Sequence, residues 1–162
     1  MNITPIPAFS DNYIWMIAHE GRVAVVDPGD PTPVLKTLEE QGLALDTIII
    51  THHHFDHTGG VSALKKATGC RVIGPDNPKI ADIDETMTEG ARVMVLGYGF
   101  EIMEVPGHTL DHIAYYNAED GTLFCGDTLF VGGCGRVFEG TFPMMQKSLA
   151  KLSHLPSETK VY

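Results

Sequence analysis

The sequence lacks several features that would assign it to large classes of protein. It has no apolar run of about 20 residues, so it predicts no membrane-spanning helix. The opening residues, MNITPIPAFSDNY, lack the basic flank and apolar core of a signal peptide. Positive charge is scarce, since 11 Lys and Arg residues stand against 21 Asp and Glu. A chain this acidic is a poor binder of nucleic acid, because phosphate groups need a basic surface. These absences favour a cytoplasmic protein with neither nucleic-acid nor membrane partners.

Cysteine is also rare. The three cysteines, Cys70, Cys125 and Cys134, are an odd number at no zinc-finger spacing, which indicates free thiols in a reducing compartment. The 162 residues are enough for one domain with a substantial core. A hydrophobic fraction of 43%, with 17 glycines and 10 prolines, is typical of a globular, loop-rich chain.

Short apolar segments predict a strand-rich fold. Helices are predicted after DPGDP, where Pro33 lies in the first turn and Gly42 ends the helix, over VSALKKATG, and over 142–154. Strands interrupted by a few helices predict an α/β or α+β fold in which helices cover the outer faces of sheets. The predicted strands are 13–18, 23–27, 45–50, 71–74, 92–96, 100–105, 112–117 and 122–126, with another beginning at 160.

Polar residues that can bind metal follow three of these strands. TIII runs into Thr51 and His52, IMEVPG runs into His108, and TLFCG runs into Asp127. Strand ends along one edge of a sheet bring side chains from distant parts of the sequence into one crevice. The sequence therefore predicts a shared site at this edge.

The segment IIITHHHFDHTGG carries the strongest chemical signal, with the pattern H-x-H-x-D-H. His52 and His54, two residues apart in a turn, can bind one ion, and Asp56 and His57 can face a second. His53 lies between two ligands and is predicted to point away. Imidazole and carboxylate together suit zinc, and also iron or manganese. Without a metal, so many polar groups behind a buried strand would need other partners.

THHHFDHTGG, VPGHT and GDTLF, in this order and spacing, resemble the metallo-β-lactamase superfamily, and GDTLFVGGCGRVFEGT resembles its hydroxyacylglutathione hydrolase (glyoxalase II) family. The resemblance implies a four-layer αββα sandwich with two mixed sheets, incomplete at its C-terminal end. It also implies that residues 1–162 form a single catalytic domain, without the C-terminal helical domain of the family. A further ligand histidine of the family, expected after KVY, is missing too, so we expect a fragment of a longer protein.

The resemblance also assigns roles to individual residues. Asp27 corresponds to an aspartate that supports the site, and Arg136 and Phe138 correspond to contacts with the glutathione part of a substrate. Some relatives have a tyrosine at the position of Phe138, so phenylalanine can make the contact but not the hydrogen bond. His112 is expected to hydrogen-bond to the wall of the site and not to bind metal. The implied metal ligands are His52, His54 and His108 for one ion, Asp56 and His57 for a second, and Asp127 between them.

The implied activity is hydrolysis of S-D-lactoylglutathione to glutathione and D-lactate, a step of methylglyoxal detoxification, by a monomeric enzyme. Two divalent metals, expected to be zinc with iron or manganese also compatible, would hold the attacking hydroxide. No catalytic residue is expected beyond that hydroxide, because a thiolate leaves without prior protonation. The alternatives are a metal-binding fragment with little turnover and a persulfide dioxygenase of the same superfamily with one iron. The acidic balance disfavours a phosphodiesterase acting on RNA.

Overall fold

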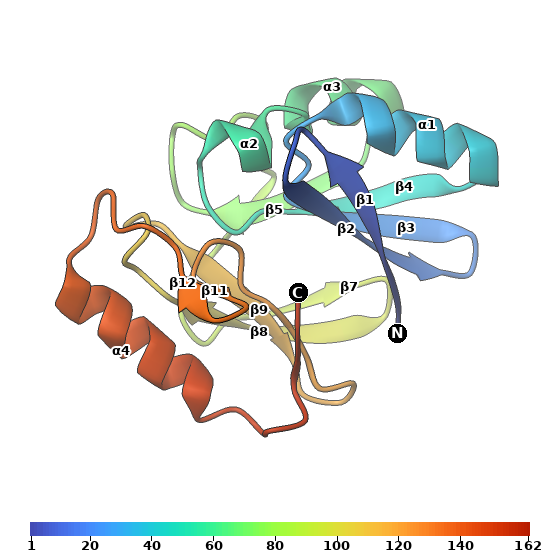
Figure 1. The fold of residues 1–162 in the computed structure, drawn as a ribbon. Helices are drawn as coiled ribbons and strands as arrows, with labels where there is room; N and C mark the ends of the chain where they lie inside the picture. Colours follow the sequence, from blue (N-terminus) through green and yellow to red (C-terminus); the bar gives the residue numbers. More distant parts are fainter.

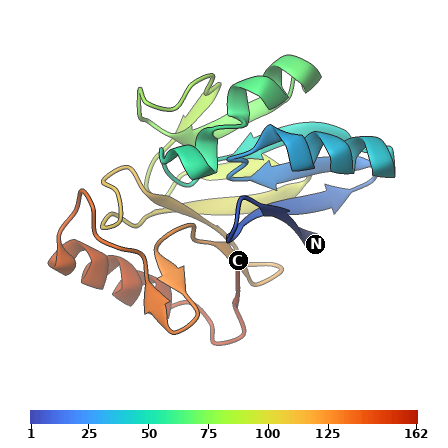
Figure 2. The same ribbon diagram turned by 45° about the horizontal axis from the view of Figure 1, so that its top comes forward.

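The computed structural model describes residues 1–162 and has two β-sheets packed face to face, with helices on their outer sides (Figures 1 and 2). The first sheet is mixed, because its first three strands are antiparallel and the later ones pair in parallel. Its six strands lie side by side in sequence order: β1 (Asn2–Ala8), β2 (Asn12–His19), β3 (Arg22–Val26), β4 (Ala44–Ile49), β5 (Arg71–Pro75) and β6 (Glu85–Met87).

The second sheet is also mixed, since one edge strand pairs in parallel with its neighbour and the other pairs are antiparallel. A separate hairpin follows it in the chain, made of β11 (Leu129–Phe130) and β12 (Gly133–Cys134). The strands of the second sheet lie in the order β13 (Lys160–Val161), β10 (Thr122–Phe124), β9 (Ile113–Asn117), β8 (Tyr98–Glu104) and β7 (Arg92–Val95).

Helices α1 (Pro31–Gln41) and α3 (Val61–Thr68) cover the first sheet, and α4 (Phe142–Ser153) covers the second (Figure 1). The boundaries of α1 follow from local chemistry: the Asp30 side chain accepts a hydrogen bond from the Thr32 N–H, and Gly42 ends the helix with φ of 63°. The remaining helix, α2 (Phe55–Thr58), is a single turn. None of the helices has the length and apolar character needed to cross a membrane.

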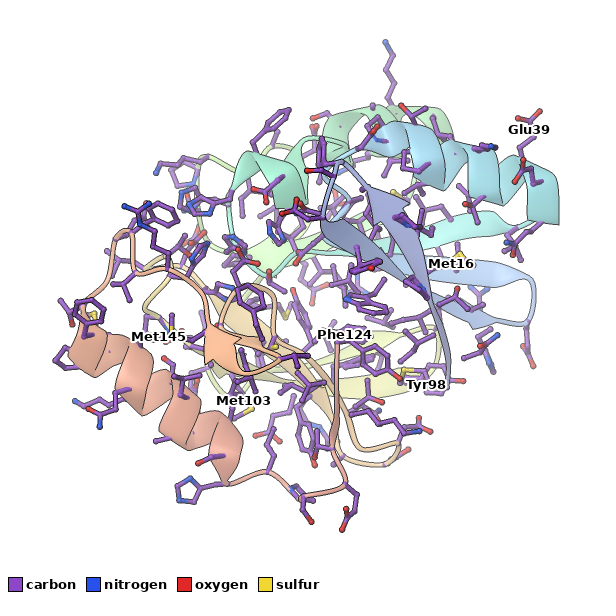
Figure 3. The ribbon with its side chains drawn as sticks, viewed as in Figure 1. Met16, Glu39, Tyr98, Met103, Phe124 and Met145 are labelled. Carbon is purple, nitrogen blue, oxygen red and sulfur yellow. The ribbon has the colours of Figure 1, made fainter.

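Three apolar cores separate the four layers. Consecutive residues of β3 alternate between them, with Val23 and Val25 facing α1 and α3 while Ala24 and Val26 face the second sheet. Strand β3 is therefore buried on both faces. Met16, Phe124 and Met103, labelled in Figure 3, lie in or against the helix-side core, the central core and the α4-side core respectively.

The arrangement confirms the predicted αββα sandwich with two mixed sheets, together with the predicted strands and helices to within a few residues. The sequence reading missed β1, β6, α2 and the β11–β12 hairpin. In β1, Pro5 and Pro7 weaken the strand signal, and the structure tolerates them because β1 is an edge strand that pairs only with β2. That residues 1–162 act as one catalytic domain stays a prediction.

Candidate metal centre

The loops that follow β4, β8 and β10 meet at one edge of the sandwich and bring all six predicted ligands together. The ring of His52 lies 4.8 Å from that of His54, 4.2 Å from that of His57 and 5.0 Å from that of His108, measured between ring centroids. The loop after β10 can approach Thr51 this closely only with glycine at position 126. There φ is +47°, and an added Cβ would lie 2.4 Å from Thr51 Oγ1. The structure therefore confirms that the polar residues following these strands lie together in one place.

The proton of His52 can be placed from its neighbours. Thr51 Oγ1 donates its single proton to Asp27 Oδ2 at 2.7 Å, so it can only accept from the Nδ1 of His52, 3.0 Å away. The proton of His52 therefore lies on Nδ1, and the lone pair is on Nε2. This Nε2 atom is buried and has no hydrogen-bond partner. An unpartnered buried lone pair is costly unless a cation binds it.

His108 is fixed in the same way by a backbone carbonyl. Its Nδ1 donates to the Arg136 carbonyl oxygen at 2.6 Å, so its Nε2 also carries a lone pair. That Nε2 lies 3.0 Å from Nδ1 of His54, and one donor atom from each of His52, His54 and His108 lies within 4.8 Å of the other two. Nitrogen ligands of a tetrahedral zinc ion lie roughly 3.3 Å apart, given bonds of about 2.0–2.1 Å. The three histidines are therefore candidate ligands of a single ion.

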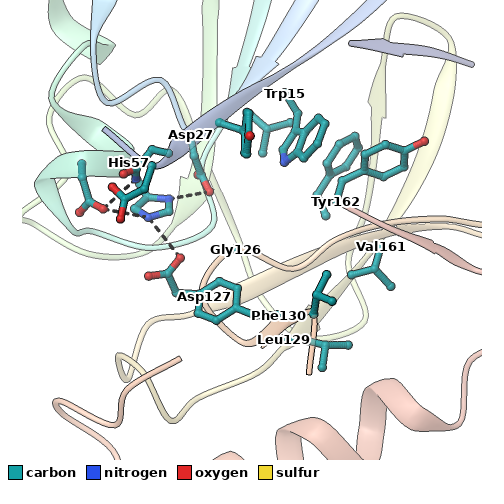
Figure 4. A pocket seen from close by; sticks show the side chains of 16 residues that line it. Trp15, Asp27, His57, Gly126, Asp127, Leu129, Phe130, Val161 and Tyr162 are labelled. Carbon is teal, nitrogen blue, oxygen red and sulfur yellow. Dashed lines mark hydrogen bonds and ion pairs between the residues drawn. The ribbon is translucent and has the colours of Figure 1, made fainter. Parts of the chain in front are cut away.

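A second group of predicted ligands lies beside the first. His57 Nδ1 donates to Asp27 Oδ2 at 3.0 Å, which leaves its Nε2 3.4 Å from Asp56 Oδ2 and 3.3 Å from Asp127 Oδ1 (Figure 4). The other oxygen of Asp127, Oδ2, lies 3.3 Å from the Nε2 of His108. The carboxylate of Asp127 thus spans the two groups, with one oxygen toward each.

Without a metal, one histidine carries the positive charge of the site. Burial, reinforced by neighbouring histidines, holds the pKa of His52 well below its usual range. Burial also lowers the pKa of His57, but hydrogen bonds with Asp127 and Asp27 outweigh this effect and raise it to about 12. The protonated His57 ring supplies the positive charge that the surrounding carboxylates require. A bound cation would take over that role, as the donor set of imidazoles and carboxylates favours.

Two residues that were not predicted to bind metal support the ligands. Asn12 Nδ2 donates to Asp56 Oδ2 at 2.9 Å, a pairing that no sequence signal indicated. His112 Nε2 accepts the backbone N–H of Asp127 at 3.1 Å, in agreement with its expected hydrogen bond to the site wall. The His112 ring also stacks on His52, with centroids 4.5 Å apart and planes at 14°.

The predicted substrate contacts lie on the side of the first ligand group. The Phe138 ring stands edge-on to His54 and His108, with centroids 5.6 and 5.3 Å away. The exposed Arg136 guanidinium lies over the Phe138 ring, 5.0 Å from its centroid.

A cavity of about 840 Å³ opens on the other side, next to Asp56, His57 and Asp127. Its far wall is mostly aromatic and includes Trp15 and Tyr162 (Figure 4). The predicted ligands therefore lie between two different surfaces. Arg136 and Phe138 lie on one side, and the mostly apolar cavity lies on the other.

Comparison with known proteins agrees with this geometry. The sequence profile described as "Metallo-beta-lactamase superfamily" matches residues 8–160. A hydroxyacylglutathione hydrolase from Chromohalobacter salexigens is 54% identical over all of this chain, which spans 65% of the length of that protein. The crystal structure of the BLEG-1 B3 metallo-beta-lactamase has the same fold, with a TM-score of 0.90 at 24% identity, covering 99% of this chain and 90% of the other. A di-iron-bound form of TTHA1623 gives a TM-score of 0.85 at 27% identity, covering 98% of this chain and 90% of the other. With this fold and a matching profile over nearly its whole length, the chain belongs to the metallo-β-lactamase superfamily.

Proposed function

We propose that the chain carries the metal-binding and catalytic residues of a thioester hydrolase that cleaves S-D-lactoylglutathione to glutathione and D-lactate. The observation that carries this proposal is the Asp127 carboxylate, whose two oxygens each lie 3.3 Å from a histidine of a different ligand group. Such a carboxylate suits a two-metal hydrolytic centre. The 54% identity to a protein named hydroxyacylglutathione hydrolase supports the substrate. A cytoplasmic, monomeric enzyme remains our expectation from the sequence.

The residues that would hold the metals follow from the lone pairs. His52 and His108 through Nε2 and His54 through Nδ1 would bind the first ion, while His57 Nε2 and Asp56 would bind the second. We expect zinc, although iron and manganese accept the same ligands. When bound, two such ions lower the pKa of a shared water toward neutrality and polarise a carbonyl oxygen.

Three further residues would support a ligand or contact the substrate. Asn12 holds the Asp56 carboxylate in place through its amide. Arg136 would attract a carboxylate of the glutathione part, and Phe138 would contact its apolar surface. The departing thiolate is a stable anion, so the reaction needs no protein acid to protonate it. This matches a site whose carboxylates all serve, in the proposal, as ligands or as supports of ligands.

The test combines metal content with turnover in the 162-residue chain. Elemental analysis should give two metals per chain, and the protein should release free thiol from S-D-lactoylglutathione. His54→Ala should reduce both the metal content and the turnover. His154→Ala is the matched control, because His154 is exposed and its Nδ1 bonds only to the Ala150 carbonyl of its own helix.

Three results would contradict the proposal or a part of it. Full metal loading without any thiol release would favour the non-catalytic metal-binding alternative. A single bound iron, with oxygen consumed in place of hydrolysis, would favour the dioxygenase alternative. Unchanged metal content in His54→Ala would contradict the ligand assignment itself.

A further inference from the structure

His53 lies between two predicted ligands in the sequence, yet its side chain belongs to a different group of residues. Its Nδ1 atom is 2.9 Å from Asp111 Oδ1, and the two side chains are only 8% and 9% exposed. The other oxygen of Asp111 accepts a hydrogen bond from Asn77 Nδ2 at 2.8 Å. The two side chains are therefore mostly shielded from solvent, hydrogen-bonded to each other and outside the ligand cluster.

The far side of the His53 ring is also occupied. Lys79 Nζ lies 3.2 Å from His53 Nε2 and 3.4 Å from Glu139 Oε1, and Glu139 Oε2 accepts the N–H of Leu110 at 3.1 Å. An ammonium group can only donate, so Nε2 of His53 accepts from Lys79 and the ring proton lies on Nδ1, toward Asp111.

His53, Asp111 and Glu139 could be taken for a third metal site, because each offers a donor atom. Two observations argue against this. Asp111 approaches Nδ1 of His53 while Glu139 lies near Nε2, on the opposite edge of the ring. An ion on one nitrogen would therefore lie away from one of the carboxylates. In addition, the positive charge of Lys79 already lies against Nε2 and Glu139. The group is better described as a hydrogen-bonded link.

This link joins the two loops that carry the ligands of the first ion. His53 belongs to the loop with His52 and His54, and Asp111 belongs to the loop with His108. The segment that carries Glu139 is tied to the second loop as well, since the Glu139 N–H donates to the His108 carbonyl at 3.3 Å. A backbone bond from the Ile113 N–H to the Thr51 carbonyl, 2.9 Å long, and the 3.0 Å contact between His108 Nε2 and His54 Nδ1 also join the two loops.

The separation of the two loops matters because the first ion draws ligands from both. Its nitrogens must lie roughly 3.3 Å from one another for all three to reach one ion. A small change in the distance between the loops would move His108 away from His52 and His54. Groups that orient metal ligands typically change metal affinity by about 10–100-fold when they are removed.

We propose that His53 is a positioning residue: through its bond to Asp111 it holds the two ligand loops at the separation that one metal ion requires. The inference rests on the metal-binding part of the proposed function and deepens it, because it names a residue that touches neither metal nor substrate. The inference concerns metal affinity alone and does not depend on which substrate is bound.

The test measures zinc affinity of the tightest site by competition with a chromophoric chelator, without substrate. The variants are His53→Ala, Asp111→Ala, the double variant, and His53→Asn, whose amide nitrogen takes about the place of the ring Nδ1. His154→Ala is the control for loss of an exposed histidine. Asp111→Asn keeps an oxygen that can accept the bond and should therefore keep most of the zinc affinity. Thermal unfolding of each metal-free variant reports on the fold.

We expect His53→Ala and Asp111→Ala each to weaken zinc binding by about 10-fold or more. The double variant should lose no more than either single variant, because both remove one bond. His53→Asn should recover most of the affinity, although it lacks the ring.

Unchanged affinity in His53→Ala, additive losses, or an equal loss in His53→Asn would overturn the inference. A wild-type chain that binds no zinc would overturn the metal-binding proposal and this inference together. Full zinc binding without hydrolysis would overturn only the proposed reaction.

Discussion

Asn12 Nδ2 donates a 2.9 Å hydrogen bond to Oδ2 of Asp56, a residue 44 positions away. The same oxygen of Asp56 lies 3.4 Å from the Nε2 of His57. The hydrogen bond from His57 and, after it, the one from Asn12 hold the pKa of Asp56 well below its usual range, against the effect of burial. Asn12 therefore fixes the direction of this carboxylate on the side of the second ligand group.

Replacing Asn12 with leucine should weaken the second metal site and leave the first intact. The orienting bond to Asp56 is lost, and a loss of about 10–100-fold in affinity is typical of such supports. Zinc titration followed by equilibrium dialysis should show one tight ion and one much weaker ion per chain. Asn2→Leu, at an exposed position of β1, is the control. Equal weakening of both ions would contradict the assignment of Asp56 to the second site.

The metal-free chain should become less stable as the pH rises, because of His57. Burial lowers the pKa of this ring, but bonds with Asp127 and Asp27 raise it to about 12, above the usual 6.5. Since the pKa is higher in the folded state, the charged ring stabilises the fold fully below about pH 6.5. That contribution is lost as the pH rises toward 12.

Thermal unfolding of the metal-free chain between pH 6 and 10 checks this prediction. The midpoint temperature of unfolding should fall more steeply with rising pH in the wild type than in His57→Gln, which has no titrating ring at this position. Saturating zinc should flatten the wild-type curve, because a ligand histidine binds as the neutral ring. Parallel curves for the two metal-free proteins would show that His57 is not held in its charged form.

Tyr115 should contribute to the stability of the fold without affecting metal binding. Its buried hydroxyl donates to the carbonyl of Ile50 at 2.9 Å, directly after the end of β4 and one residue before Thr51. Tyr115→Phe leaves that carbonyl without this partner and should lower the free energy of unfolding by about 1–3 kcal/mol. Chemical denaturation of the metal-free chain measures the loss. Tyr116→Phe, at a half-buried neighbouring position, should cost less, and zinc stoichiometry should remain unchanged in both.

The proposed metal ligands could be identified from the sequence because the signal is local. His52, His54, Asp56 and His57 lie within six consecutive positions, and His108 and Asp127 directly follow apolar strand segments. The residues that orient these ligands have no comparable local pattern in the sequence.

Asn12 reaches Asp56 only because the sheet brings the start of β2 beside α2, and the partner of His53 lies 58 positions away. A pattern within a window of residues cannot show which distant side chain completes a hydrogen bond. The same holds for β1, whose prolines are acceptable only because the strand lies at the edge of its sheet.

Phe138→Tyr should strengthen binding of glutathione thioesters. The Phe138 ring is 57% exposed and stands beside the rings of His54 and His108, so a hydroxyl on it would reach solvent or a substrate without being buried. One added hydrogen bond contributes about 0.5–1.5 kcal/mol, which corresponds to a KM lower by about 2–10-fold with kcat little changed. Steady-state kinetics with S-D-lactoylglutathione measure both constants. Phe142→Tyr, at an 82% exposed position where α4 begins, is the matched control and should leave KM unchanged. A Phe138→Tyr enzyme with the wild-type KM would place the glutathione part elsewhere, away from Arg136 and Phe138.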